Sequence, residues 1–320
     1  MTANCLCSAP SLDDGRRNVA ACRTPVAALP SEYIPFSLEY VRPYRALYAS
    51  MPVRTLAFSL PNLWAWRDYI GLEIRFAHGL AWLRRMKRGV HILAPAGPWD
   101  QIDWSALQAE LLDAGEIYRV PEYLAGIWQK HLTCRMDVIE NRDFWEYVYK
   151  AEDLATLVGK RYHMQRNHVN TYVREHGEPD LRPLGPGDTS AMLELASRWH
   201  AEREVTDSTR AEIESLRRIR KQWDHLDLTA EGLFLENRLA AFAVGHDLDE
   251  STMAVLYEKA EPGLRGAFPV MTSSFARLAV EQGKTYVNRA EDMGEEGMRK
   301  SKMLYRPVDF QRMCIVRFHN

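Results

Sequence analysis

The sequence predicts an α+β (mixed α/β) protein built from two domains. Its 320 residues exceed the usual size of a single domain. Hydrophobic residues make up 46% of the chain and aromatic residues 10%, which is enough to bury sizeable cores. Short apolar runs typical of strands alternate with longer runs of helical periodicity along most of the chain.

Two changes in composition mark the domain boundaries. Residues 1–30 are rich in Ser, Pro, Ala and charge without periodicity, so we expect a disordered tail. The segment 178–187 contains three prolines and two glycines, which is typical of a linker. We therefore expect a first domain over residues 31–178 and a second domain over residues 179–320.

The first domain shows a few strands, a helix and a further strand, followed by a long helical region. Apolar runs bounded by glycines or charged turns predict strands. These runs cover residues 55–60, 72–77, 80–83, 89–93, 117–120 and 144–149. Asp103 begins a helix that Gly115 ends, and residues 153–176 form an apolar stripe that Gly159 divides into two helices.

The helical region 153–176 carries a basic face opposite its apolar stripe. The polar residues on or near this face are Lys160, Arg161, His163, Arg166, Asn167, His168, Asn170 and Arg174. The formal net charge of the chain is only −2, so a polyanionic ligand such as tRNA needs a local patch of this kind. A solvated basic face and a phosphate-binding patch both explain the pattern.

The second domain shows a clearer order of elements. Helices are predicted over residues 190–203, 210–223, 267–282 and 295–305, and strands over 233–236, 239–245, 252–258, 285–288 and 313–318. The tight turn Asn237-Arg238 favours a hairpin between the first two strands. This order is that of the GCN5-related N-acyltransferase (GNAT) fold. The first half follows it less clearly, so we expect two tandem GNAT-like domains, each a mixed sheet flanked by helices.

The stretch 286–307 holds the densest chemistry in the chain. Ionisable residues of both signs crowd a predicted strand-to-helix junction, where ligands often bind in mixed α/β folds. Asp292 and Glu295 also fit a capping box, and Glu295 and Arg299 have the spacing of a helical ion pair. The residues that this structural explanation leaves over are Asn288, Arg289 and Glu291.

A family resemblance rests on residues 143–170, which begin Asp-Phe-Trp-Glu-Tyr-Val-Tyr, and on residues 287–307, which begin Val-Asn-Arg-Ala-Glu-Asp-Met. Both stretches resemble the phosphatidylglycerol lysyltransferase C-terminal-like family, in particular its soluble, uncharacterised branch, and the similarity extends over about residues 31–320. The resemblance implies a tandem pair of acyltransferase-like domains. In the membrane members of the family, this unit moves an aminoacyl group from tRNA to a lipid head group.

The chain departs from those lipid-modifying members. It has no window with the roughly 18 consecutive apolar residues of a membrane-spanning helix, so a lipid acceptor is not implied. Their last strand–helix region differs, so their catalytic residues are not carried over. The first thirty residues lack the basic start and apolar run that are typical of a signal peptide, and the five cysteines show no metal-ligand or disulfide pattern. We therefore expect a cytoplasmic protein without a membrane partner.

Aminoacyl transfer to an amine or hydroxyl needs a base, an oxyanion-stabilising group and an acid. The candidate catalytic residues are Glu258, Glu291 and Asp292 as bases and Tyr305 as the acid. The candidate substrate-binding residues are Lys259, Asn288, Arg289, Arg299 and Lys302. The candidate phosphate- or tRNA-binding residues are Lys160, His163, Arg166, Asn167, Arg265 and Gly266. For each of them, a salt bridge, a cap or a core position is the alternative.

We expect no metal and no tightly bound cofactor, because the sequence lacks His-Glu-x-x-His, Cys-x-x-Cys and Walker motifs. The acyl-CoA pyrophosphate motif Arg/Gln-x-x-Gly-x-Gly/Ala is poorly met, since alignment on Gly266 places Gly263 first and Phe268 last. Three functions remain open. They are an aminoacyl-tRNA-dependent transferase acting on a small soluble acceptor or peptide, an acyl-CoA-dependent N-acyltransferase, and a non-catalytic ligand-binding protein.

Overall fold

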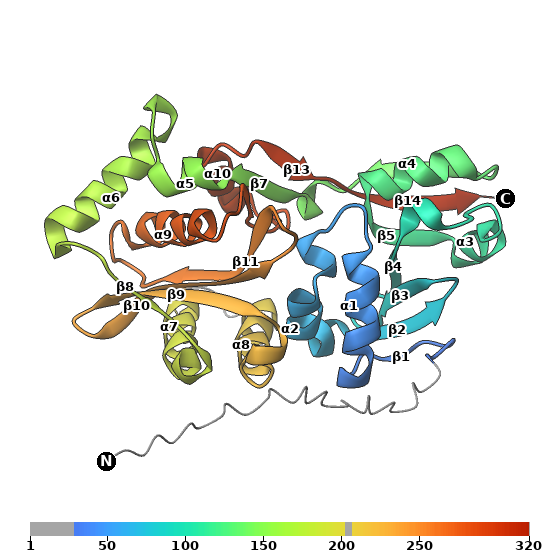
Figure 1. Ribbon diagram of the computed structural model, residues 1–320, viewed down its shortest axis with the longest axis horizontal. Coiled ribbons are helices and arrows are strands. Elements are labelled where there is room, and N and C mark those ends of the chain that lie inside the picture. Colours follow the sequence, from blue (N-terminus) through green and yellow to red (C-terminus); the bar gives the residue numbers. More distant parts are fainter. Residues whose placement is uncertain (1–28, 202–206, 320) are drawn as a thin grey trace, which may run out of the picture.

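The computed structural model describes residues 29–201 and 207–319 (Figure 1). Two seven-stranded sheets lie side by side along the long axis, and helices flank each of them. The predicted mixed α/β fold is therefore confirmed. The predicted tail falls outside the described residues except for residues 29 and 30.

The first sheet has the order β1-β2-β3-β4-β5-β14-β6. Its strands are β1 (Ile34–Pro35), β2 (Leu72–Ala77), β3 (Leu80–Arg85), β4 (His91–Ala96), β5 (Glu116–Pro121), β14 (Met313–His319) and β6 (Arg135–Glu140). The flanking helices are α1 (Val41–Ala49), α2 (Leu60–Ile70), α3 (Gln108–Ala114) and α4 (Glu122–His131). Trp99, Trp104 and Trp128 are fully buried in the core between these elements.

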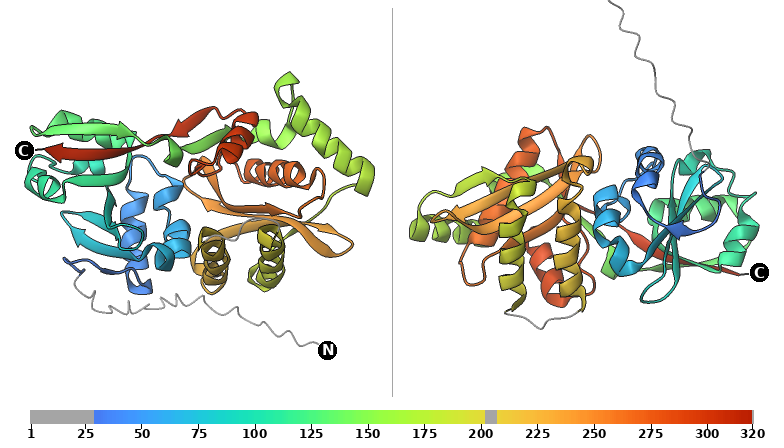
Figure 2. Two further views of the ribbon diagram at one scale, coloured as in Figure 1. Left: turned by 180° about the vertical axis from the view of Figure 1, so that it is seen from behind. Right: turned by 90° about the horizontal axis from the view of Figure 1, so that it is seen from below.

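The second sheet has the order β13-β7-β12-β11-β10-β9-β8. Its strands are β13 (Asp309–Gln311), β7 (Glu146–Lys150), β12 (Tyr286–Asn288), β11 (Thr252–Ala260), β10 (Arg238–Asp247), β9 (Leu228–Leu235) and β8 (Asp180–Pro183). Its helices are α5 (Ala151–Thr156), α6 (His163–His176), α7 (Thr189–Ala201), α8 (Asp207–Arg220), α9 (Ala267–Glu281) and α10 (Glu296–Leu304). Helices α7 and α8 cover one face, and α9 covers the other (Figures 1 and 2). The predicted order of the second half is confirmed.

The two sheets do not divide at the predicted linker, and the last strand returns to the first sheet. β7 precedes the predicted linker at residues 178–187, yet it pairs between β13 and β12 in the second sheet. The last strand, β14, returns to the first sheet and pairs between β5 and β6. Helices α5 and α6 also pack on α9. The chain thus crosses between the sheets near residues 141–145 and again near residue 312, so sheet membership does not follow a single cut at residue 178.

The structure corrects one predicted element. Residues 55–60 form a 3₁₀ turn (Leu56–Phe58) and the beginning of α2 instead of a strand. Ser59 is the N-cap of α2. Two amides of the 3₁₀ turn donate to the carboxylate of Glu146 at 2.9 and 2.8 Å. The turn is therefore fixed by a distant residue, which a local pattern does not reveal.

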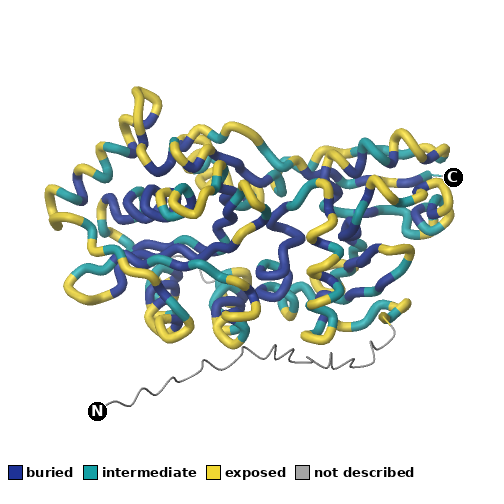
Figure 3. The backbone as a smooth tube through the Cα atoms, in the orientation of Figure 1, coloured by how far each residue is buried: buried dark blue, intermediate teal, exposed yellow. Residues whose placement is uncertain are grey.

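Helix α2 itself gives no amphipathic signal, because it is buried on several sides. Its buried residues are Leu60, Pro61, Leu63, Trp64 and Ala65. A helix that is apolar around most of its circumference shows no one-sided stripe. The helices of the second sheet differ in how far they are buried. Figure 3 shows that α9 is mostly buried, whereas much of α6 lies exposed at the rim.

The pair β11–β12 positions the candidate site. These strands are parallel neighbours over three residue pairs, Thr252 to Ala254 against Tyr286 to Asn288. β11 then continues to Ala260 alone, so the two strands separate at their carboxyl ends. Ligands of mixed α/β sheets commonly bind where neighbouring strands separate in this way.

Candidate functional site

The turn from residue 289 to residue 295 connects β12 to α10, with Arg289 and Asp292 buried and residues 293–295 exposed. The buried polar residues at this junction are Asn288, Arg289 and Asp292. Lys302 on α10 closes the turn, because its Nζ donates to the carbonyl oxygens of Arg289 and Glu291 at 2.6 and 2.5 Å. Burial lowers the pKa of Lys302 to about 8. The predicted substrate-binding role of Lys302 therefore competes with a structural one.

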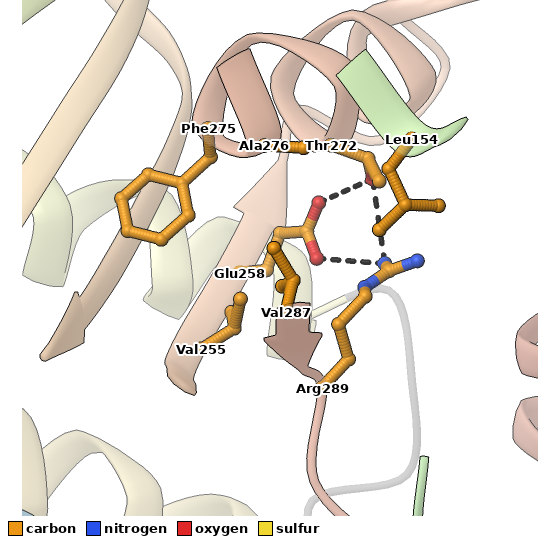
Figure 4. Close-up of a pocket in the computed structure, with 8 residues that line it drawn as sticks. All are labelled: Leu154, Val255, Glu258, Thr272, Phe275, Ala276, Val287 and Arg289. Atoms are coloured by element: carbon orange, nitrogen blue, oxygen red, sulfur yellow. Dashed lines mark hydrogen bonds and ion pairs between the residues drawn. The ribbon is translucent and has the colours of Figure 1, made fainter. Parts of the chain in front are cut away.

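Glu258 and Arg289 face each other in a crevice where β11 and β12 separate (Figure 4). Arg289 Nη2 donates to Glu258 Oε2 at 2.7 Å, and Thr272 Oγ1 donates to Oε1 at 2.5 Å. The other lining residues are Leu154, Val255, Phe275, Ala276 and Val287. The crevice is too narrow to hold a water molecule. It is thus an apolar slot closed by an ion pair.

The Arg289 guanidinium is charged but only partly satisfied. Arg289 is only 7% exposed. Burial by itself lowers the pKa of Arg289, but the charge and hydrogen bond of Glu258 together with the neighbouring Tyr149 and Tyr305 outweigh burial, and the pKa rises. Nη1 points away from the carboxylate in Figure 4 and has no hydrogen-bond partner among the described residues. Since an unpaired buried donor is costly, Nη1 is a candidate ligand-binding group.

Three aromatic rings surround this guanidinium. Arg289 Cζ lies 4.8 Å from the ring centre of Tyr305 and 5.8 Å from those of Tyr149 and Phe268. The predicted acid, Tyr305, therefore lies beside the predicted anion-binding residue. Burial raises the pKa of Tyr305, so its hydroxyl remains protonated around neutral pH.

Asp292 is the centre of a second network. Its fully buried carboxylate accepts hydrogen bonds from Arg142 Nη1 at 3.2 Å, Tyr147 Oη at 2.5 Å, and Arg299 Nε and Nη2 at 3.0 and 2.9 Å. Burial tends to raise the pKa of Asp292, but hydrogen bonds from Arg299 and Tyr147 outweigh it and lower the pKa to about 2. Because four side-chain donors crowd this carboxylate and it does not line the crevice, Asp292 is poorly placed to accept a further proton.

The predicted capping box is wrong. Helix α10 has Glu295 at its N-cap, without a side-chain cap. Asp292 Oδ1 instead accepts from the amide of Gly294 at 3.0 Å. The carboxylate turns towards Arg142, in the 3₁₀ turn between β6 and β7, and towards Arg299 on α10, because two guanidinium groups bind it more strongly than one helix amide.

Glu291 and Asn288 point to other partners. Glu291 pairs with Arg119 of β5 at 3.1 Å, so it bridges the two sheets and does not line the crevice. Asn288 Nδ2 donates to Glu146 Oε2 at 2.6 Å. Burial and, next, the charge of Glu291 raise the pKa of Glu146 to about 7. These contacts clamp the site turn to the first half of the chain.

Lys259 lies on the opposite face of the sheet from Glu258. Successive side chains of a strand alternate between faces, so the two neighbours cannot share one site surface. Lys259 Nζ pairs with Glu212 of α8 at 2.9 Å, and its side chain is 9% exposed. His200 Nε2 lies 2.9 Å from the same carboxylate. The structure therefore does not bring Lys259 together with the other predicted substrate-binding residues.

The predicted phosphate-binding residues separate into two groups. Lys160, His163 and Asn167 are exposed on or before α6. Arg166 instead donates to the carbonyl oxygens of Leu157 and Gly159, which fixes the loop between α5 and α6.

The loop before α9 is covered by α6. Arg265 is exposed, but Gly266 is buried with φ of +85°. A Cβ at Gly266 would lie 2.3 Å from the carbonyl oxygen of His168 on α6. Only glycine fits here, and the reason is the close approach of another helix.

Four further residues belong to the site but were not predicted from the sequence. They are Arg142, Glu146, Tyr147 and Thr272. Glu146 and Tyr147 lie within the resembling stretch 143–170, but a strand pattern does not reveal which of its polar residues are buried. Across residues 29–201 and 207–319, His, Cys, Asp and Glu side chains form no cluster of three that could hold a metal ion.

The family model described as "Phosphatidylglycerol lysyltransferase, C-terminal" matches residues 49–316. The chain belongs to this family. The match covers both sheets and both stretches on which the resemblance rests, so the expected family is confirmed. A transferase role in general is supported by this membership.

Three solved structures share the fold. A conserved protein of unknown function from Bacteroides thetaiotaomicron is 24% identical with a TM-score of 0.81, covering 91% of this chain and 100% of that one. L-PGS from Bacillus licheniformis is 12% identical with a TM-score of 0.60, covering 86% and 91%. FemX is 10% identical with a TM-score of 0.60, covering 90% and 98%. At these identities the similarity shows the fold alone.

Among the described residues, no helix combines the length and the apolar character that crossing a bilayer requires.

Proposed function

We propose that this protein transfers an aminoacyl group from aminoacyl-tRNA to an amine or hydroxyl of a small acceptor or peptide. Family membership supports a transferase role. The choice of aminoacyl-tRNA over acyl-CoA as donor rests on one observation: side chains fill the space between β11 and β12. Leu154 and the Arg289–Glu258 pair occupy this opening, and α6 lies against Gly266 at the beginning of α9.

The filled opening between β11 and β12 and the covered beginning of α9 both argue against an acyl-CoA donor. A pyrophosphate group binds well at a helix N-terminus only if its oxygens can reach the open amides. Here the backbone before α9 is packed against the carbonyl oxygen of His168. The slot between the strands admits no water molecule, and therefore no pantetheine arm in this conformation. Calorimetry with acetyl-CoA and a longer acyl-CoA should give no binding heat, and saturable binding would favour the acyl-CoA alternative.

The exposed basic face of α6 supports tRNA as the donor. Helix α6 projects along the rim of the second sheet (Figure 1), with Lys160, His163 and Asn167 exposed. Contacts to phosphates position a nucleic acid without reading its sequence, which suits recognition of a tRNA body.

The roles that we propose for the crevice residues follow from their contacts. Of the three candidate bases, Glu258 lines the crevice, whereas Glu291 and Asp292 are engaged elsewhere. The acceptor nitrogen or oxygen adds to the ester carbonyl carbon, and Glu258 takes its proton. The carbon–oxygen bond to the tRNA ribose then breaks, and Tyr305 protonates the leaving oxygen.

A discharge assay tests this function. The protein is incubated with tRNAs charged with each of the twenty amino acids, in the presence of an acceptor-rich lysate freed of nucleic acid. We expect faster loss of one aminoacyl ester, and about a 100-fold slower loss with Glu258→Gln. The exposed Lys300→Ala on α10 is the matched control and should retain the rate. If none of the twenty esters is discharged faster than in buffer, the proposal is wrong.

The basic face makes a separate prediction about binding. Lys160→Glu combined with His163→Glu should weaken tRNA binding and lower the slope of log affinity against log salt by about 1 for each lost phosphate contact. Filter binding over a salt series measures the slope. Lys130→Glu, on α4 of the other half, is the control and should leave it unchanged.

A further inference from the structure

The strongest unexplained group in the described structure is Arg289 Nη1. It belongs to a charged guanidinium whose residue is 7% exposed, and it has no hydrogen-bond partner among the described residues. Leaving such a donor unpaired costs roughly 1–3 kcal/mol, and more for a charged group. A buried charged donor without a partner is therefore a candidate for meeting a ligand.

The other nitrogen, Nη2, is held in place. It donates to Glu258 Oε2 and lies 3.3 Å from Thr272 Oγ1. Thr272 also donates to the second oxygen of Glu258. This triangle fixes the plane of the guanidinium, so Nη1 points in a defined direction, away from Glu258 (Figure 4).

The surroundings of Nη1 favour a negative group. Lys302 lies beside the same turn and binds the carbonyl oxygens of Arg289 and Glu291. Lys302 Nζ forms no ion pair with a carboxylate of the described residues, although Glu291, Asp292 and Glu258 act on its charge as well as Arg289. The rings of Tyr149, Phe268 and Tyr305 keep the region apolar, which strengthens a charge-assisted hydrogen bond.

We propose that the crevice is an oxyanion-binding site in which Arg289 Nη1 donates to one oxygen of a carboxylate or phosphate group. The site is closed in the present conformation, because the crevice that Leu154 of α5 helps to line is too narrow for a water molecule. In the context of the proposed function, a carboxylate belongs to an amino-acid or peptide acceptor, and a phosphate belongs to the tRNA end. The oxyanion chemistry is common to both sources.

Calorimetric titration of the full chain with small anions tests the site. One arm uses N-acetylglycine and diglycine as carboxylate probes, and the other uses inorganic phosphate and adenosine monophosphate, all at one ionic strength with chloride as the blank. We expect saturable binding in one arm. The arm that binds identifies the acceptor or the tRNA end as the source.

Three variants decide whether Arg289 is responsible. Arg289→Lys keeps the charge but removes Nη1, so affinity should fall at least tenfold. The double variant Arg289→Gln with Glu258→Gln leaves no buried charge unpaired and should also lose binding while remaining folded. Leu154→Ala removes a side chain that lines the crevice, so the crevice widens and binding should become stronger.

Two results overturn the proposal. One is the absence of binding by wild type and by Leu154→Ala in both arms, which would mean that the aromatic rings alone satisfy Nη1. The other is equal affinity in Arg289→Lys and the double variant. Because no tRNA is needed, anion binding without discharge of any charged tRNA would retain this site and reject the proposed transferase function.

Discussion

Asp292 shows how one residue changes meaning between sequence and structure. Its position before a predicted helix suggests either a cap or a base. In the structure it is fully buried and binds the guanidinium groups of Arg142 and Arg299 together with the hydroxyl of Tyr147. A carboxylate with this many donors is ionised, and its hydrogen-bonding capacity is used. It therefore orders the site turn and is a weak candidate for proton transfer.

Replacing Asp292 with Ala should lower the free energy of unfolding by about 3 kcal/mol, because two guanidinium groups and a buried hydroxyl lose their acceptor. Since the folded pKa is about 2, below the ordinary value of 3.8, the stability from Asp292 is present above about pH 4 and is lost as the pH falls towards 2. Urea unfolding of wild type and variant at pH 7 and pH 3 measures this. The exposed Glu296→Ala should change little at either pH.

At the scale of elements, Glu146 connects three segments. It begins β7, accepts from two amides of the 3₁₀ turn Leu56–Phe58, and accepts from Asn288 at the end of β12. Burial is the main reason that its pKa rises to about 7, and the charge of Glu291 adds to it. The junction between the two sheets therefore contains a titrating carboxyl group near neutral pH.

Stability should respond to this group in a defined direction. Because the folded pKa of Glu146 exceeds its ordinary value of 4.5, the native state binds its proton more tightly than the unfolded state. Its contribution is full below about pH 4.5 and is lost as the pH rises through about 7. Glu146→Gln should flatten this part of the pH dependence in urea unfolding. Glu140→Gln, exposed on β6, should retain the slope of wild type, and an unchanged slope in Glu146→Gln would contradict the assignment.

At the scale of the whole molecule, the last strand joins the two halves. β14 is the last strand of the chain, yet it fills the position between β5 and β6 in the first sheet. Its Phe318 ring packs against Trp128 with ring centres 5.5 Å apart. The second sheet is built from the consecutive strands β7 to β13, but the first sheet is incomplete without β14, which follows them in the chain. We therefore expect the halves to fold together.

A charge in β14 should therefore destabilise both halves at once. Val316 is fully buried in this strand, and Val316→Asp should lower the melting temperature by more than about 10 °C, because an unpaired charge enters the core. Calorimetry should show a single transition for wild type and for the variant. Arg317→Ala, exposed on the same strand, is the control. Two well-separated transitions would show that the halves unfold independently.

Part of the site could be predicted from the sequence. Glu258, Arg289 and Tyr305 were each identifiable as polar or ionisable residues near predicted strand ends and a predicted helix end, and the structure brings these three together. Thr272 could not be identified, because a threonine inside an apolar helix resembles any other. Lys259 was predicted to bind substrate together with Glu258, but neighbouring residues of a strand face opposite sides of the sheet.

The sequence by itself determined the order of elements in the second half, the basic face of α6 and the family, because periodicity, turns and motifs are local properties of the chain. The tertiary structure alone decided which strands are neighbours, which carboxylates are already engaged, and that Arg289 retains an unpaired nitrogen. The physical reason is that hydrogen-bond occupancy and burial depend on groups far apart in sequence: Glu146 meets the turn at Leu56 across 90 residues, and Asp292 meets Arg142 across 150.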